Sequence, residues 1–279
     1  MQNTSPNQLL ASTAAWTAGV RAKESERDDH LFFDPWAEAL AGEEGMTWIE
    51  SRPVDSALPI AIRTRYFDDF LQRITRQQAI SQVVLLAAGL DTRAYRLSWP
   101  EDTIIFELDQ PAVLAHKESV LREAGARPTC RRRSAGADLA APWTDALVEM
   151  GFEPRLPAVW LLEGFLFYLP NESITSILDT VTGLSAAGSW VGFDIINSTM
   201  LTSPITAKWI AMQAQSGAPW IGTMDDPRAF MARRGWETAL MQAGAENANY
   251  GRWRLPVFPV LQPDVPHNWY VTARTQAGS

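Results

Sequence analysis

Residues 83–97 read VVLLAAGLDTRAYRL, and this stretch decides the fold class. It opens with an apolar run that is typical of a strand buried on both faces of a sheet. The run ends in a turn of small residues that contains Gly89, and a helix is expected to begin at Asp91. In an open α/β sheet, ligands bind beyond the carboxyl ends of the strands, so the stretch predicts a binding site at this turn.

The same alternation of strand and helix continues along the chain. Strands are expected at 83–86, 103–108, 127–134, 158–162 and 190–196, with helices at 111–123, 143–150 and 171–184 between them. This order predicts an α/β fold with a parallel sheet whose two faces are covered by helices.

The predicted domain organisation is a single domain over residues 1–279 with four parts. Its N-terminal third lacks strands and favours helices. The parts are a helical cover (1–80), a cofactor-binding core (81–196), a cap insertion (197–235) and C-terminal strands (236–279). The cap is too long for a simple loop, and its Trp209 and Trp220 are candidates to line a flat pocket.

The composition narrows the class of partner. The chain has 279 residues and a net charge of −8, which disfavours nucleic acid and anionic membranes as partners, because both require a basic face. With one cysteine, Cys130, no intramolecular disulfide and no cysteine-based zinc site can form. The start MQNTSPNQLL does not have the pattern of a signal peptide, and no apolar stretch is long enough to span a bilayer. We therefore expect a cytoplasmic protein without a metal centre; the oligomeric state is not predicted.

A second candidate strand ends at Asp109, in the stretch FELDQP (106–111). Gly89 and Asp109 are 20 residues apart, the spacing at which a carboxylate beyond the second strand binds the ribose of a nucleotide. We therefore expect Asp109 to accept hydrogen bonds from the vicinal hydroxyls of a nucleoside. The alternative is that Asp109 only caps the helix that follows it.

The turn itself indicates which nucleoside binds. A dinucleotide site has the pattern G-x-G-x-x-G, whereas the corresponding positions here are Ala87, Gly89 and Thr92. The carboxylate of Asp91 at the helix start would repel a pyrophosphate but attract a cationic tail. The predicted cofactor is therefore S-adenosyl-L-methionine, which carries an ammonium and a sulfonium and no phosphate, and a nicotinamide-dependent oxidoreductase is disfavoured. In the alternative, Asp91 is a helix cap and nothing more.

Three stretches in this order resemble the bacterial branch of the leucine carboxyl methyltransferase family: LLAAGLDTRAYRL (85–97), FELDQP and LLEGFLFYLP (161–170). The resemblance is nearest to the subgroup that includes polyketide-synthesis O-methyltransferases of the tetracenomycin type. The stretches RAKESERDDHLFFDPWAEALAG, ANYGRW and PHNWYVTAR extend the resemblance over nearly the whole chain. It implies a Rossmann-like class I methyltransferase fold, with a seven-stranded sheet whose last strand is antiparallel and helices over the site.

The resemblance also implies roles for single residues toward the adenosine and methionine parts of the cofactor. The turn of Ala87 and Gly89 would face the methionine part, and Asp138 and Leu139 would bracket the adenine. The family usually has glycine where this chain has Ala87. Its methyl group would crowd the ligand unless φ stays negative, but we expect tolerance, because the turn contacts the ligand through its backbone.

The remaining implied roles concern the amino-acid tail of the cofactor. Glu163 would lie near the amino group, Arg63 would pair with the carboxylate, and Lys23 or Arg21 would assist it. Without the resemblance, Arg63 would be read as an arginine at the edge of an apolar helix stripe whose head group reaches solvent.

The chemistry expected at this site is methyl transfer to oxygen. A carboxylate acceptor is ionised at neutral pH, whereas a phenol requires a base or a metal, and the chain has only three histidines. His267, near the start of the last strand, is the candidate base. We therefore predict an O-methyltransferase that acts on a carboxylate of a small-molecule acceptor, an aromatic or polyketide secondary metabolite. The alternatives are a phenol or hydroxyl acceptor, with His267 or an acidic residue as base, and a cofactor-binding protein without catalysis.

Overall fold

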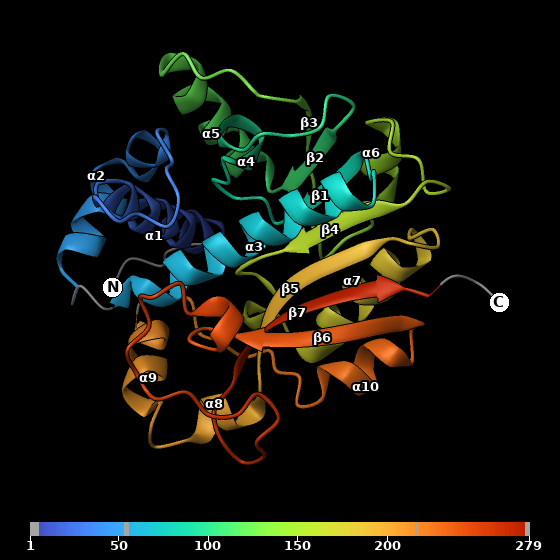
Figure 1. Ribbon diagram of the computed structural model, residues 1–279. Coiled ribbons are helices and arrows are strands. Elements are labelled where there is room, and N and C mark those ends of the chain that lie inside the picture. The colour runs from blue at the N-terminus through green and yellow to red at the C-terminus, as the bar shows by residue number, and fades with distance from the viewer. Residues whose placement is uncertain (1–5, 53–55, 216, 277–279) are drawn as a thin grey trace.

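The computed structural model describes residues 6–52, 56–215 and 217–276, and these form one sheet covered by helices (Figure 1). The sheet has seven strands in the order β3-β2-β1-β4-β5-β7-β6. β7 is antiparallel to both β5 and β6, and the other neighbours are parallel. The strands are β1 (Gln82–Leu86), β2 (Ile104–Asp109), β3 (Arg131–Gly136), β4 (Ala158–Leu162), β5 (Trp190–Ile196), β6 (Trp236–Gln242) and β7 (Asn268–Thr275). The predicted class, a mostly parallel seven-stranded sheet with an antiparallel last strand, is confirmed.

The central strands form where the sequence is uniformly apolar. Every residue of β1 and of β4 is buried, which is typical of parallel strands covered on both faces. β4 and β5 begin and end at the predicted residues. β3, with the sequence RRRSAG, lies at the edge of the sheet and is largely exposed.

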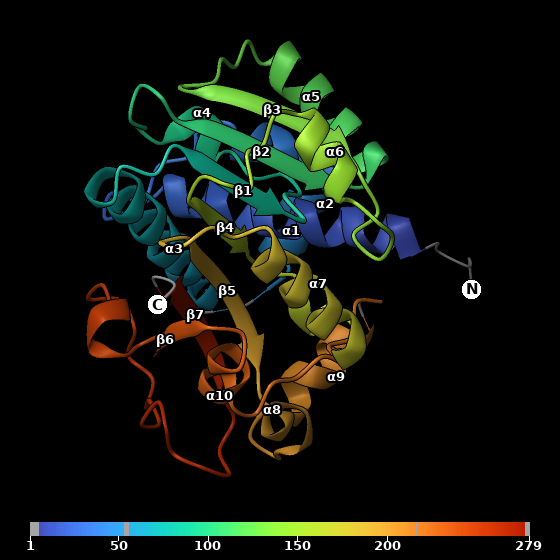
Figure 2. The same cartoon turned by 90° about the vertical axis from the view of Figure 1, so that its right-hand side faces the viewer.

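Helices cover both faces of the sheet (Figures 1 and 2). On one face, α3 (Leu58–Gln77) packs its apolar stripe and α5 (Pro111–Glu123) contributes Leu121 to the same cluster. On the other face, α6 (Thr144–Glu149), α7 (Asn171–Gly183) and α10 (Pro227–Ala232) share a second cluster with the strands. Among the described residues, no helix combines the length and apolar character that crossing a bilayer requires.

The helix predicted from Asp91 is much shorter than expected. Only α4 (Arg93–Arg96) forms, and Leu97 after it is extended, with φ −91° and ψ 152°. Both arginines of α4 turn inward to Asp68 on α3, with nitrogen–oxygen distances of 2.6 Å for Arg93 and 2.6 Å for Arg96. We infer that the burial of these two arginines in ion pairs, and not helix propensity, determines the conformation of residues 91–97.

The N-terminal helices α1 (Pro6–Ser25) and α2 (Ala37–Glu50) cross in direct backbone contact. A Cβ added to Gly19 would lie 2.6 Å from the carbonyl oxygen of Gly45, and one added to Gly45 would lie 2.4 Å from that of Ala15. Real Cβ atoms do not approach backbone so closely, so this crossing requires glycine on both helices.

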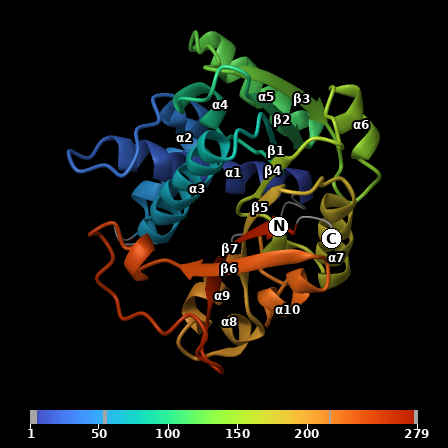
Figure 3. The ribbon, with the colours of Figure 1, turned by 45° about the vertical axis from the view of Figure 1, so that its right-hand side comes forward.

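The segment 197–235 contains α8 (Ser198–Thr202), α9 (Ala207–Gln215) and α10, and lies with β6 and β7 at the opposite end of the sheet from β3 (Figure 3). Its residues Ile221 and Gly222 donate backbone hydrogen bonds of 2.8 and 3.0 Å to the carbonyl of Phe167 in η2 (Leu166–Tyr168). The segment therefore supports the short helix that follows β4.

Candidate active site

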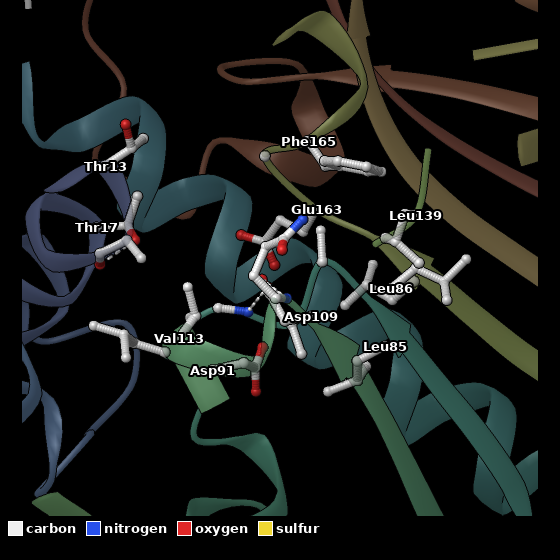
Figure 4. A pocket seen from close by; sticks show the side chains of 18 of the residues that line it. Thr13, Thr17, Leu85, Leu86, Asp91, Asp109, Val113, Leu139, Glu163 and Phe165 are labelled. Atoms are coloured by element: carbon white, nitrogen blue, oxygen red, sulfur yellow. Dashed lines mark hydrogen bonds between the residues drawn. The ribbon is translucent and has the colours of Figure 1, made fainter. Parts of the chain in front are cut away.

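The cavity that gathers the predicted site residues lies at the carboxyl ends of β1, β2 and β4 (Figure 4). α1 and α3 also contribute to its walls, through Thr13, Thr17 and Arg63. The predicted site residues that line it are Arg63, Ala87, Gly89, Asp91, Asp109, Asp138, Leu139 and Glu163, together with Arg21. Lys23 and His267 do not line it.

Asp109 and Gly89 join the ends of β2 and β1. The Gly89 N–H donates a 2.6 Å hydrogen bond to Oδ2 of Asp109, and the Gln110 N–H donates one of 2.6 Å to Oδ1. No arginine or lysine in the described part of the chain forms an ion pair with this carboxylate. Burial therefore raises the pKa of Asp109, although the two N–H groups act in the opposite direction. Each oxygen keeps a free lone pair for the hydroxyl of a ligand.

Ala87 occupies the left-handed region of backbone space, with φ +53°. A negative φ, which would keep the methyl group of Ala87 clear of the ligand, is therefore not what the structure has. Tolerance of this methyl group then rests on the expectation that the turn contacts the ligand through its backbone. The left-handed conformation costs an L-residue about 1–2 kcal/mol. Gly89, two residues later in the same turn, is also left-handed, with φ +48°. The Ala87 side chain packs against the apolar cluster under the sheet.

Asp138 and Leu139 follow β3 and line the side of the cavity next to Asp109. Oδ1 of Asp138 accepts a 2.9 Å hydrogen bond from the Ala140 N–H, which fixes the turn. Leu139 is buried, and Figure 4 shows it beside Leu86 among the side chains that line the cavity. An apolar side chain beside a polar loop provides one wall for a flat ring.

Glu163, directly after β4, is held by two arginines from different helices. Nε of Arg63 lies 2.9 Å from Oε1, and Nη2 of Arg93 lies 2.7 Å from Oε2. Burial alone would raise the pKa of Glu163, but Arg93 and Arg63 together lower it. The carboxylate is therefore kept ionised at the cavity wall.

Arg93 also binds Asp91. The backbone N–H of Arg93 donates a 2.6 Å hydrogen bond to Oδ1 of Asp91, and Nη1 of Arg93 contacts Oδ2 of the same carboxylate. Burial disfavours the charged form, yet Arg93 and the nearby cations outweigh it and lower the pKa of Asp91 to about 2. The N-cap residue of α4 is Thr92 and not Asp91, so Asp91 lies one residue before the observed cap position, where it accepts from the Arg93 N–H and lines the cavity.

The described walls of the cavity and the residues directly behind them carry more carboxylates than cations. Seven carboxylates belong to this set, namely Asp34, Asp68, Asp91, Asp109, Asp138, Glu163 and Asp194. Four arginines pair with five of them, namely Arg21, Arg63, Arg93 and Arg96. The remaining negative charge favours a ligand that carries net positive charge.

Lys23 does not reach this cavity, so the structure does not support its predicted role. Its Nζ lies 3.1 Å from Glu26 and 3.6 Å from Glu50, and it lines a separate pocket between α1, α2 and residues 251–255. Arg21 faces the cavity instead and is fixed there by Asp34 at 2.9 Å and the Leu90 carbonyl at 2.6 Å. Two residues turn an α-helix by about 200°, so the two side chains point in opposite directions.

His267 is likewise absent from the described lining of the cavity, and its position does not fit a catalytic base. It is 2% exposed, its Nδ1 lies 2.9 Å from Oε1 of Gln242, and its Nε2 lies 2.8 Å from the Gln262 carbonyl. The ring also stacks on Trp269, with 4.8 Å between centroids. Both nitrogens are thus engaged in fixing the loop before β7.

The tryptophans of the 197–235 segment also lie outside the cavity. Trp220 packs on Phe167, with 4.6 Å between ring centroids, and Trp209 packs edge-on against Trp220 at 6.1 Å. The prediction that these two rings line a flat pocket does not hold for the described cavity. They support η2 from behind, and Phe165 and Tyr168 on either side of Phe167 line the cavity instead.

Sequence reasoning missed Arg93 and Asp194. Arg93 lies next to the glycine turn, and its two acidic partners other than Asp91 are 25 and 70 residues away. Asp194 interrupts the apolar strand WVGFDII, and a charged residue at such a position signals a buried ion pair. That signal is present in the sequence, although it does not name the partner.

Apolar and aromatic side chains also line the cavity. Those from α3, from η2 and its flanks, and from α7 are Ile60, Phe165, Tyr168, Leu169 and Ile177. The cavity thus combines charged with apolar and aromatic lining. Among the described residues, no group of three or more histidine, cysteine or acidic side chains is placed to hold a metal ion.

Comparison with known proteins identifies the family of this chain. The sequence model of the leucine carboxyl methyltransferase family matches residues 14–182, more than half of the chain. The chain belongs to the leucine carboxyl methyltransferase family. The matched region of this family contains every predicted residue that lines the cavity.

Curated relatives are similar to this chain over most of their length. One from Saccharopolyspora erythraea is 38% identical over 258 residues, which cover 86% of this chain and 88% of that protein. One from Mycobacterium tuberculosis is 34% identical over 269 residues, which cover 88% and 86%. Both are named "Putative S-adenosyl-L-methionine-dependent methyltransferase", in agreement with the predicted cofactor.

Solved structures share the fold at low sequence identity. A protein from Thermobifida fusca that is described as a "putative methyltransferase" has a TM-score of 0.58 at 20% identity, and the alignment covers 93% of this chain and 94% of that chain. A DUF574 protein from Streptomyces avermitilis has a TM-score of 0.60 at 14% identity, with 95% and 99% covered. These similarities establish the architecture described above.

Proposed function

We propose that this chain is an S-adenosyl-L-methionine-dependent O-methyltransferase that forms a methyl ester on a carboxylate of a small aromatic acceptor. The observation that supports a carboxylate acceptor is the composition of the cavity wall. Its described lining contains no histidine, lysine or cysteine. An acceptor that arrives ionised needs no base, and a carboxylate with a pKa near 4 is such an acceptor.

Glu163, Asp91 and the phenol of Tyr168 are poorly suited to remove a proton from a hydroxyl, and Asp109 is assigned to the ribose. Glu163 and Asp91 are neutralised by arginines and their pKa values are lowered, which makes them weak bases. Burial raises the pKa of Tyr168, so its phenol stays protonated. Alignment of donor and acceptor is then the main contribution of the protein to the reaction.

The residues of the wall fit the methyl donor. Asp109 would accept the ribose hydroxyls, Asp138 and Leu139 would flank the adenine, and Glu163 would face the ammonium. Nη2 of Arg63, for which no described residue is an acceptor, would bind the carboxylate of the amino-acid tail. When bound, the donor supplies an electrophilic methyl group on a positively charged sulfur, whose leaving group is neutral.

The apolar and aromatic lining of the cavity supports an aromatic acceptor. The rings of Phe165 and Tyr168 line the cavity, together with the aliphatic side chains of Ile60, Leu169 and Ile177. Such a lining favours a flat, mostly apolar molecule with a few polar groups. We include secondary metabolites of polyketide type in this class on the basis of the motifs in residues 85–97 and 161–170.

The experiment that tests the proposal uses a methyl donor labelled in its methyl group and a panel of aromatic acids and matched phenols. Methyl esters release labelled methanol on treatment with mild alkali, whereas methyl ethers do not. We expect alkali-labile product from the acids and none from the phenols. Alkali-stable product from the phenols alone would instead assign hydroxyl methylation, and binding of the donor without transfer to any acceptor would indicate a cofactor-binding protein.

A further inference from the structure

We propose that Asp194 is a positioning residue that fixes Arg63 and the turn carrying Glu163, and thereby sets the affinity of the site for the amino-acid tail of the methyl donor. This inference rests on the proposed function, because it assumes that Arg63 and Glu163 hold that tail. Asp194 itself lies behind the cavity wall and contributes no atom to its described lining.

The first observation is that one carboxylate binds two separate parts of the wall. Oδ2 of Asp194 accepts a 2.9 Å hydrogen bond from Nη1 of Arg63 on α3, and Oδ1 accepts one of 2.6 Å from the Gly164 N–H after β4. Asp194 is on β5. It is 131 residues from Arg63 and 30 residues from Gly164 along the chain, so it connects β5 to α3 and to the turn after β4.

The second observation is the close packing of Arg63 against Gly164. Gly164 has φ +67°, and a Cβ added to it would lie 2.9 Å from Nη2 of Arg63. The guanidinium is thus confined between the Glu163–Gly164 turn and Asp194. Its Nε is directed to Glu163 at 2.9 Å and its Nη1 to Asp194, and Nη2 forms no hydrogen bond with a described residue.

The third observation is the cost of this arrangement. Asp194 is 0% exposed and lies between Phe193 and Ile195 in a strand whose other residues are uncharged. A buried carboxylate is unfavourable unless it is paired, and a well-packed apolar residue at such a site is often at least as stable. A costly buried charge that orients two residues of a ligand site fits a role in binding.

The test compares ligands with and without the amino-acid tail. Asp194→Asn keeps the shape of the side chain but loses its charge, and it cannot accept from both Arg63 and Gly164. Calorimetry would give the Kd of S-adenosylhomocysteine, which has the tail, and of methylthioadenosine, which lacks it. We expect the first Kd to rise at least about tenfold and the second to stay within about twofold of wild type.

Asp69→Asn is the matched control, because Asp69 forms a 2.9 Å pair with Arg65 on the exposed side of α3, outside the cavity. It should leave both Kd values unchanged. If the tail-specific loss is absent in Asp194→Asn, or if both ligands weaken equally, Asp194 has no positioning role. Asp194→Ser, which keeps one acceptor for the Gly164 N–H, serves if the Asn variant does not fold. Failure of both variants to fold would identify Asp194 as a structural residue and overturn the proposal.

The same measurements separate this inference from the proposed function. If wild-type protein binds neither adenosine compound, the proposed function fails before Asp194 is tested. If wild-type protein binds both ligands equally well, the tail is not recognised, and the positioning role fails while the nucleoside site stands.

Discussion

Gly89 and Asp109 are joined by a 2.6 Å hydrogen bond from a backbone N–H to a half-buried carboxylate that forms no ion pair with a described residue. The bond spans the ends of two adjacent parallel strands. It holds the glycine turn against the carboxylate at one edge of the sheet. The geometry explains why a spacing of 20 residues between these positions recurs as a ribose-binding signature.

We expect Asp109→Ala to raise the Kd of the methyl donor by about tenfold or more, since it removes charge-assisted hydrogen bonds worth about 1.5–3 kcal/mol. Isothermal calorimetry with S-adenosylhomocysteine measures this change. Asp138→Ala, an exposed position on the same wall, is the comparison and should have a smaller effect. Unchanged affinity in Asp109→Ala would show that this carboxylate does not bind the ribose.

Ala87→Gly should stabilise the protein by about 0.5–1 kcal/mol. The substitution relieves the left-handed strain at φ +53°, and the greater freedom of glycine in the unfolded chain offsets part of the gain. Denaturation in urea measures the free energy of unfolding. Ala79→Gly, at an exposed residue with φ +50°, should give a similar gain. A loss of stability in Ala87→Gly alone would show that the packing of its methyl group outweighs the strain.

Asp91 should make unfolding sensitive to acid. Its pKa is about 2 in the folded protein and 3.8 ordinarily, so its stabilising contribution is complete above the ordinary pKa and is lost as the pH falls toward 2. In Asp91→Asn, the loss of unfolding free energy between pH 5 and pH 2 should be smaller by about 2 kcal/mol. Urea titrations at several pH values measure it, with Asp145→Asn on exposed α6 as the control. An identical acid response in wild type and Asp91→Asn would contradict the ion pair with Arg93.

His267→Ala should lower stability by about 2–3 kcal/mol but leave kcat/KM of the folded enzyme nearly unchanged. The substitution removes a buried ring with two hydrogen-bond partners, and that ring does not face the cavity. Thermal unfolding and initial-rate assays well below the transition measure the two effects. A fall of about 100-fold in rate with the fold intact would assign general-base catalysis to this histidine.

The strands β4 and β5 and the Gly89–Asp109 pair could be predicted, because the sequence patterns that indicate them lie within short stretches of the chain. β4 and β5 follow from uniform apolar runs, and the Gly89–Asp109 pair follows from a fixed spacing. The arginine network could not be predicted in the same way. Arg93 meets Glu163 across 70 residues, and Arg63 meets Asp194 across 131, so only the folded sheet brings them together.

The roles predicted for Lys23 and His267 do not fit the structure, because the side chains of both residues point away from the cavity. Lys23 and Arg21 are both on α1. Arg21 is on the side of the helix that lines the cavity, whereas Lys23 is on the side that lines the separate pocket. His267 is at the predicted strand edge, but its ring turns to Gln242 and the Gln262 carbonyl. A position along the chain gives the edge of the sheet, while the side-chain direction depends on packing that the sequence does not display locally.

The glycine crossing of α1 and α2 restricts how this site can change in evolution. Since Gly19 and Gly45 admit no side chain, a shift of the α1 wall near Thr13 and Thr17 requires a matching shift of α2. Descendants that acquire new acceptors therefore have more freedom on the opposite wall, where the side chains of Phe165 and Tyr168 can be exchanged one at a time.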